Sequence, residues 1–253
     1  MPPGGPGAAP YDEERGSPYD EELGVDERTQ VLVAGGGPAG ATAATLLARQ
    51  GFDVTLLERD RFPRYHIGES LLPSLLPVLD VMGAREAVER HGFTRKTGAF
   101  YGWSGQEWQL RFDTSDRPAA YSFQVIRSEF DHLLLEHARA QGVRVREETQ
   151  VRRVGFDGYR TTSATWTSRY GRAGQTHFRC LVDASGRAGV LAARQLRTRR
   201  FHDVFRNVAA WGYCAAPRPC RTHRRARSAS SPCPSTDESG PSPSTTAPSA
   251  SAW

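Results

Sequence analysis

A glycine-rich turn between two apolar runs is the most informative chemical feature of this sequence. Its spaced glycines are Gly35, Gly37 and Gly40. The apolar run 31–34 precedes the turn, which continues through Pro38 and Ala39 into an alanine- and leucine-rich stretch, and a second apolar run, 52–57, ends at Glu58. These glycines allow a tight turn, close approach of the backbone to a pyrophosphate and close helix–strand packing, while the acid binds a ribose. The free N–H groups of the following helix favour an anion. The pattern predicts a dinucleotide site.

A second turn of the same chemical type lies near residue 183. The apolar run 178–182 ends in Asp183, and Gly186 closes the turn. In a Rossmann-like sheet, this places a carboxylate and a bare backbone beside the ribityl chain and pyrophosphate of the cofactor. An ordinary Asx-type turn without a ligand is the alternative.

Lys96 is the only lysine among the 33 lysine and arginine residues. Such a strong preference for arginine draws attention to a lysine that persists, because an amine can be neutralised and a guanidinium cannot. Chance is the alternative explanation.

The elements that must position these residues follow from the pattern of apolar residues. We expect a loop over 62–70, a helix over 71–81, strands within the aromatic-rich segment 97–112, and a helix over 127–140 with Ser128 as its N-cap. Further short strands are expected at 143–147, 151–156, 164–168 and 178–183. The fold class is therefore α/β, a Rossmann-like fold with an interleaved aromatic-rich β-sheet.

Domain organisation follows from composition. Residues 1–28 are predicted to be a disordered leader, 29–213 the folded domain, and 214–253 a disordered tail rich in serine, proline and arginine.

Bulk properties exclude several classes of function. The net charge is +5, but the tail 214–253 holds five arginines against two acids, so no basic nucleic-acid groove is predicted. No apolar run reaches 18 residues, and no secretory signal is apparent. The four cysteines suggest neither a disulfide framework nor a complete metal site. We expect a cytoplasmic protein without a metal.

The segment 58–73 narrows the class further. The two glycine turns together resemble those of FAD-dependent aromatic hydroxylase-type flavoproteins, and Arg127 matches the arginine that these enzymes place against the flavin, but the segment 58–73 usually looks different in plain flavin hydroxylases. The run from Glu58 to Pro73 closely resembles flavin-dependent halogenases of the tryptophan-halogenase superfamily, especially those acting on phenols or pyrroles. The resemblance implies cofactor-binding roles for four residues of this run: Arg59, His66, Glu69 and Ser70. A hydrogen-bonded loop pair is the alternative for His66 and Glu69.

The same resemblance gives Lys96 a role. Phe93-x-x-Lys96-x-Gly98 matches the context of the family's catalytic lysine. The family mechanism implies that FADH2 from a separate flavin reductase reacts with O2 to give a flavin hydroperoxide, which oxidises chloride or bromide to hypohalous acid. Lys96 then passes the halogen to an aromatic substrate, free or tethered to a carrier protein, in secondary-metabolite (antibiotic) biosynthesis. Desolvation favours such a lysine because it lowers the pKa of the amine.

The sequence departs from the family pattern near residue 213. The family's Trp-x-Trp-x-Ile-Pro motif is absent, and we hypothesise that residues after 213 are a shifted reading of a halogenase gene, since a shifted frame at 240–248 permits Trp-x-Ile-Pro-Leu-His-Asp-Gly-Thr. We expect little turnover from this chain as written. Two alternatives remain: an FAD-dependent aromatic monooxygenase and a non-catalytic FAD-binding remnant.

Overall fold

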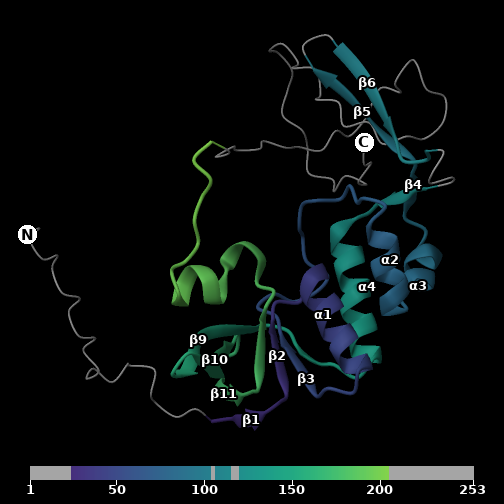
Figure 1. The fold of residues 1–253 in the computed structure, drawn as a ribbon. Helices are drawn as coiled ribbons and strands as arrows, with labels where there is room; N and C mark the ends of the chain where they lie inside the picture. Colours follow the sequence, from purple (N-terminus) through teal and green to yellow (C-terminus); the bar gives the residue numbers. More distant parts are fainter. Residues whose placement is uncertain (1–23, 104–105, 115–119, 205–253) are drawn as a thin grey trace, which may run out of the picture.

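The centre of the fold is a parallel sheet. The computed structural model describes residues 24–103, 106–114 and 120–204 (Figure 1). Four strands form the sheet in the order β12-β2-β3-β8: β2 (Val31–Ala34), β3 (Val54–Leu57), β8 (Arg144–Arg146) and β12 (Cys180–Asp183). All three pairings are parallel, and every residue of β2 and β3 is buried. Continuous apolar strands of this kind belong to sheets covered on both faces. The predicted α/β class is confirmed.

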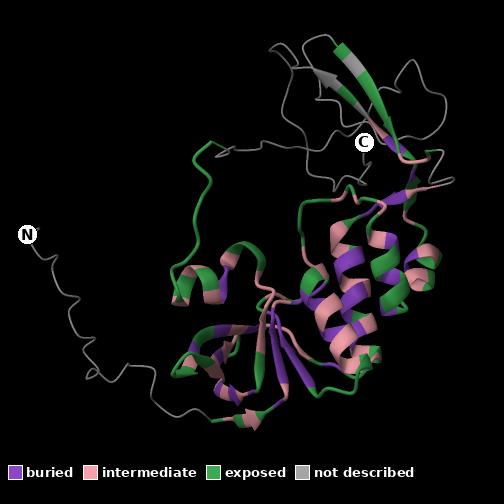
Figure 2. Ribbon diagram, viewed as in Figure 1, coloured by how far each residue is buried: buried purple, intermediate pink, exposed green. Residues whose placement is uncertain are grey.

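Helices cover one face of this sheet. The helices α1 (Pro38–Arg49) and α4 (Arg127–Ala140) lie against the sheet, and α2 (Leu75–Met82) and α3 (Arg85–His91) pack against these two helices (Figure 1). Their buried side chains include Leu79, Met82, Phe130 and Leu134. Figure 2 shows the buried residues concentrated in β2, β3 and the inner faces of α1 and α4.

A second, mostly antiparallel sheet lies on the other side. Its order is β1-β11-β10-β9, from β1 (Asp26–Arg28), β9 (Thr149–Asp157), β10 (Arg160–Ser168) and β11 (Ala173–His177). Trp166 and Phe178 pack here against Leu32 and Leu57 of the parallel sheet. The strand β1 pairs in parallel with β11, so residues 26–28 of the segment 1–28, which was expected to be a disordered leader, form part of a sheet.

Two small sheets complete the fold. The strands β4 (Thr94–Lys96) and β7 (Ser122–Gln124) pair antiparallel, as do β5 (Gly98–Trp103) and β6 (Gln106–Arg111). The rings of Tyr101 and Trp108 stack across the β5–β6 hairpin with centroids 5.5 Å apart. The hairpin confirms the strands predicted within 97–112.

Two boundaries differ from the expectations. The helix α2 begins at Leu75 rather than 71, because Leu71 N–H donates to the Phe123 carbonyl of β7 (3.0 Å) and extends the sheet contact. The N-cap of α4 is Ile126, and Ser128 lies inside the helix, so the predicted N-cap is wrong. After β12 the chain forms a 3₁₀ turn, η1 (Gly186–Ala188), and a π-helical segment, η2 (Val190–Gln195). The predicted tail 214–253 and the proposed frame shift lie outside the described residues.

No helix in the described ranges has the length and apolar character needed to cross a membrane.

Candidate functional site

Steric contacts fix the glycine turn between β2 and α1. Gly35 has φ +109°, and a Cβ there would lie 2.5 Å from the carbonyl oxygen of Ala184. A Cβ on Gly40 would lie 1.8 Å from the carbonyl oxygen of Gly35. Both distances are far below van der Waals contact, so neither position accepts a side chain without moving the backbone.

Gly37 lies in a different environment. A Cβ there would meet only Nη2 of Arg64, at 3.4 Å, and its backbone is extended (φ −68°, ψ −179°). The protein itself therefore tolerates a methyl group at this position.

The first turn of α1 is suited to an anion. Gly37 is its N-cap, Pro38 its first residue, and no side chain caps it. Free N–H groups and the helix dipole favour a negative group at such an end. The bare glycine cradle and this helix end fit the pyrophosphate of FAD.

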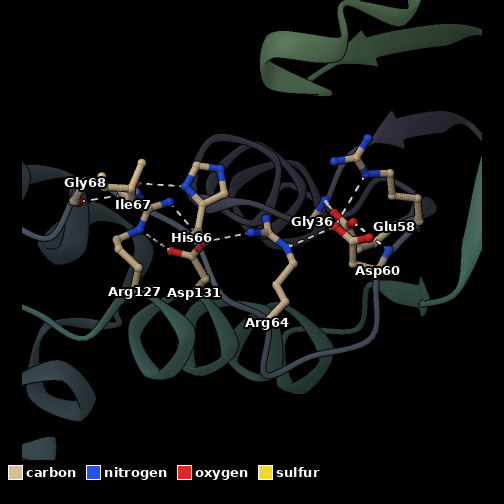
Figure 3. A network of polar contacts seen from close by, with 10 residues as sticks. Gly36, Glu58, Asp60, Arg64, His66, Ile67, Gly68, Arg127 and Asp131 are labelled. Atoms are coloured by element: carbon tan, nitrogen blue, oxygen red, sulfur yellow. Dashed lines mark hydrogen bonds and ion pairs between the residues drawn. The ribbon is translucent and has the colours of Figure 1, made fainter. Parts of the chain in front are cut away.

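Glu58 lies at the end of β3, directly beside the turn. It is 5% exposed; Gly36 N–H donates to its Oε2 (2.5 Å) and Asp60 N–H to its Oε1 (2.9 Å) (Figure 3). In this structure its carboxylate therefore holds the glycine turn, and its contact with a ribose stays a prediction. Arg59 is exposed and pairs with Asp60 (3.4 Å).

The second turn, Asp183–Gly186, packs against the first. Ala184 N–H donates to the Ala34 carbonyl (2.9 Å). The Asp183 carboxylate accepts bonds from the Ser185 hydroxyl (2.5 Å) and backbone N–H (3.1 Å) and from Leu191 N–H (2.8 Å). Burial opposes ionisation, but the Ser185 hydroxyl and the backbone N–H groups outweigh it and lower the pKa of Asp183. The Asx-type turn is thus present, and Gly186 takes a positive φ of +59°, while the place of Asp183 beside a cofactor stays a prediction.

A buried network of ion pairs connects the region of the two turns to α4. Arg127, the first residue of α4, donates from Nε and Nη2 to the two oxygens of Asp131 (2.8 and 3.0 Å) and from Nη1 to the Ile67 carbonyl (2.7 Å) (Figure 3). Asp131 has no exposed surface, and Nη1 of Arg64 lies 3.7 Å from it. Sequence reasoning missed both Asp131 and Arg64. The i,i+4 spacing of Arg127 and Asp131 was the available signal.

The loop that Arg127 holds contains the remaining predicted residues. His66 is exposed, and its Nδ1 lies 2.8 Å from the Ile67 carbonyl. The Glu69 carbonyl accepts a bond from Val125 N–H (2.9 Å). Ser70 forms an antiparallel bridge with Gln124 of β7. The loop is thereby fixed to the β4–β7 sheet.

Lys96 lies at the end of β4, paired with Ser122 of β7. The residue is 2% exposed, its Nζ donates to the Ser70 hydroxyl oxygen (2.5 Å), and Nζ lies 5.3 Å from the centre of the Phe112 ring. Burial lowers the pKa of the amine. The structure thus brings Lys96 and Ser70 together, two residues that the sequence analysis selected for separate reasons.

An open hollow of about 460 Å³ adjoins this lysine through Phe112. The residues lining it are Leu72, Pro73, Ser74, Arg111, Phe112, Thr114 and Ala120. Its volume is in the range of small-molecule sites.

Comparison with known proteins decides the family. The profile of a family described as FAD binding domain matches residues 28–213. The chain belongs to this FAD-binding domain family. A tryptophan 2-halogenase from Chondromyces crocatus is 54% identical over 191 residues, which are 73% of this chain and 35% of that protein. The flavin-dependent halogenase armH1 from Armillaria mellea is 46% identical over 202 residues, 76% of this chain and 39% of that protein.

Solved structures agree with this FAD-binding domain assignment. The myxobacterial chondrochloren halogenase CndH superposes with a TM-score of 0.59 at 37% identity, covering 62% of this chain and 37% of that one. The predicted resemblance to flavin-dependent halogenases is confirmed. The chain spans 35–42% of the length of the curated relatives it matches.

Proposed function

We propose that this chain is the FAD-binding part of a flavin-dependent halogenase that acts on an electron-rich phenol or pyrrole. One observation carries the proposal: the only lysine of the sequence is buried, beside a hollow and bonded to Ser70 of the loop at 66–70. A buried amine has a larger neutral fraction, and only the neutral form has a lone pair for an electrophile.

The cofactor-side residues have separate tasks in this proposal. The N–H groups at the start of α1 bind the pyrophosphate of FAD, with Gly37 leaving the approach open. Glu58 and Asp183 orient the ribose and ribityl hydroxyls, and Arg127 faces the flavin while holding the Ile67 carbonyl. Reduced FAD, delivered by a separate flavin reductase, supplies with O2 the oxidising power that turns a halide into an electrophile.

Lys96 acts on the substrate side. Its amine captures or hydrogen-bonds the electrophilic halogen species and presents it to an aromatic ring. The hollow lined by Phe112 and Leu72 holds this ring, either free or tethered to a carrier protein.

Two measurements test the proposal. The 253-residue chain is titrated with FAD, and binding is followed by quenching of flavin fluorescence; we expect binding that Gly37→Ala weakens. Halogenation is measured on the form extended in the shifted frame after residue 213, supplied with a reductase, NADH and bromide or chloride. We expect halide-dependent products by mass spectrometry, abolished in Lys96→Ala. Hydroxylated products that need no halide would instead identify an aromatic monooxygenase.

A further inference from the structure

The Ser70–Lys96 contact joins a loop to a strand that the sequence keeps 26 residues apart. The resemblance to flavin-dependent halogenases implied a cofactor-binding role for Ser70, and in the structure its hydroxyl oxygen lies 2.5 Å from Nζ of Lys96. Ser70 itself is exposed, whereas Lys96 is 2% exposed. The serine therefore reaches the amine from the solvent-facing side.

No other polar partner holds the amine within the described ranges. Nζ has one hydrogen bond there, to Ser70, and no carboxylate within 4.0 Å, and the Phe112 ring is its other neighbour. The paired strand β7 contributes only uncharged residues, Ser122–Gln124. The titratable or charged groups on the segments around Lys96 are His66, Glu69, Arg95, Arg111, Asp113 and Tyr121. Burial alone lowers the pKa of the amine, without a contribution from these charges.

The backbone fixes the position of Ser70 on both sides. Val125 N–H donates to the Glu69 carbonyl (2.9 Å), and Leu71 N–H donates to the Phe123 carbonyl (3.0 Å). Both bonds go to β7 or the residue that follows it, and β7 pairs with the strand that carries Lys96. The hydroxyl and the amine are therefore held by the same small sheet.

We propose that Ser70 is the positioning residue of Lys96, whose hydroxyl orients the buried amine toward the hollow. This inference rests on the proposed function of Lys96 and adds to it a residue that acts through the lysine. As an acceptor, the hydroxyl favours the ammonium form and so opposes the effect of burial. When the amine is neutral, the same hydroxyl fixes where its lone pair points.

The absence of any other lysine makes the test direct. Lysine labelled with ¹³C at Cε gives one lysine signal in an NMR spectrum of the full 253-residue chain, and its pH titration reports Lys96 alone. In Ser70→Ala the buried ammonium loses its acceptor, and we expect the midpoint to fall by about one pH unit. Ser70→Thr keeps the hydroxyl and is expected to titrate like the wild type. Ser128→Ala, inside α4, is the matched control and is expected to leave the Lys96 midpoint unchanged.

A Ser70→Ala midpoint equal to that of the wild type, in a folded protein, would overturn the proposal. Circular dichroism checks folding, and if Ser70→Ala does not fold, Ser70→Cys, with its weak acceptor, replaces it under the same criterion. These titrations contain no FAD or halide, so they are independent of halogenation. In the extended form, Ser70→Ala is further expected to lower kcat at least ten-fold with KM unchanged. A shifted midpoint without wild-type halogenation would reject the proposed function and leave the positioning role standing.

Discussion

The glycine turn at 35–40 and the site around Lys96 belong to one fold but are held in different ways. In the turn, backbone atoms meet so closely that a single added carbon would lie 1.8 Å from a carbonyl oxygen. Around Lys96, a side chain enters an apolar environment and is held by one hydroxyl group. The Gly35–Gly40 contact joins residues five positions apart, whereas the lysine site needs three distant segments: the loop, β4 and β7.

This difference separates stability from chemistry. A side chain added at a closely packed glycine destabilises the fold, because the packed backbone cannot move to make room for it. A buried amine already lowers the stability of the fold, and such a residue is retained where the function of the protein needs it. Substitutions in the two regions are therefore expected to have opposite signs.

The largest effect is expected at Gly40. Gly40→Ala forces a Cβ against the Gly35 carbonyl and should lower the free energy of unfolding by about 4 kcal/mol or more, measured by urea denaturation. Gly37→Ala is the matched control, because its Cβ meets only Arg64 at ordinary contact distance. It should change stability by less than about 0.5 kcal/mol while weakening FAD binding at least ten-fold. Equal stability of the two variants would contradict the steric account of the turn.

Asp131 lies between the two regions and gives the next effect. Asp131→Ala leaves Arg127 without its buried carboxylate, and we expect a loss of about 3 kcal/mol in chemical denaturation. Glu86→Ala breaks an exposed pair with Arg90 (3.8 Å) and should cost less than about 0.5 kcal/mol. A loss for Asp131→Ala no larger than that of the control would show that the network is not structurally important.

The smallest effect has the opposite sign. Lys96→Met keeps the volume and removes the buried amine, so we expect a gain of about 1 kcal/mol near neutral pH, or about 2–4 °C in Tm. The folded-state pKa of Lys96 is lowered, so between that value and 10.5 the unfolded chain binds more protons, and wild-type stability rises with pH. The gain should shrink as pH rises through this window and vanish above 10.5. A methionine variant less stable than the wild type at every pH would argue against desolvation.

Local patterns predicted the parts of the fold that depend on neighbouring residues. The β2–α1–β3 unit, the aromatic strands and the position of Lys96 all follow from short spacings in the sequence. The β4–β7 pair was missed, because strands of three residues carry almost no periodicity and find each other only in three dimensions. Asp131 was missed for a related reason: its importance depends on Arg64, which comes from a distant loop.

In the candidate site, too, local features were predicted from the sequence and contacts between distant residues were not. The spacing of the glycines and Asp183 placed two turns that the structure packs together. The partner of Ser70 could not be deduced, since no sequence rule states which of a loop's groups faces a strand 26 residues later. Ser128 was assigned as an N-cap by residue type, but the helix begins one residue earlier.

The strand order of the parallel sheet has a consequence for biosynthesis. β2 emerges early from the ribosome, yet one of its two neighbours, β12, is made near the end of the described chain: Val31 pairs with Cys180. Until then, one edge of β2 has unpaired N–H and C=O groups, which can pair with strands of other chains. The nascent protein therefore completes its central sheet late, and a chaperone that shields β2 during translation should raise the yield of folded protein.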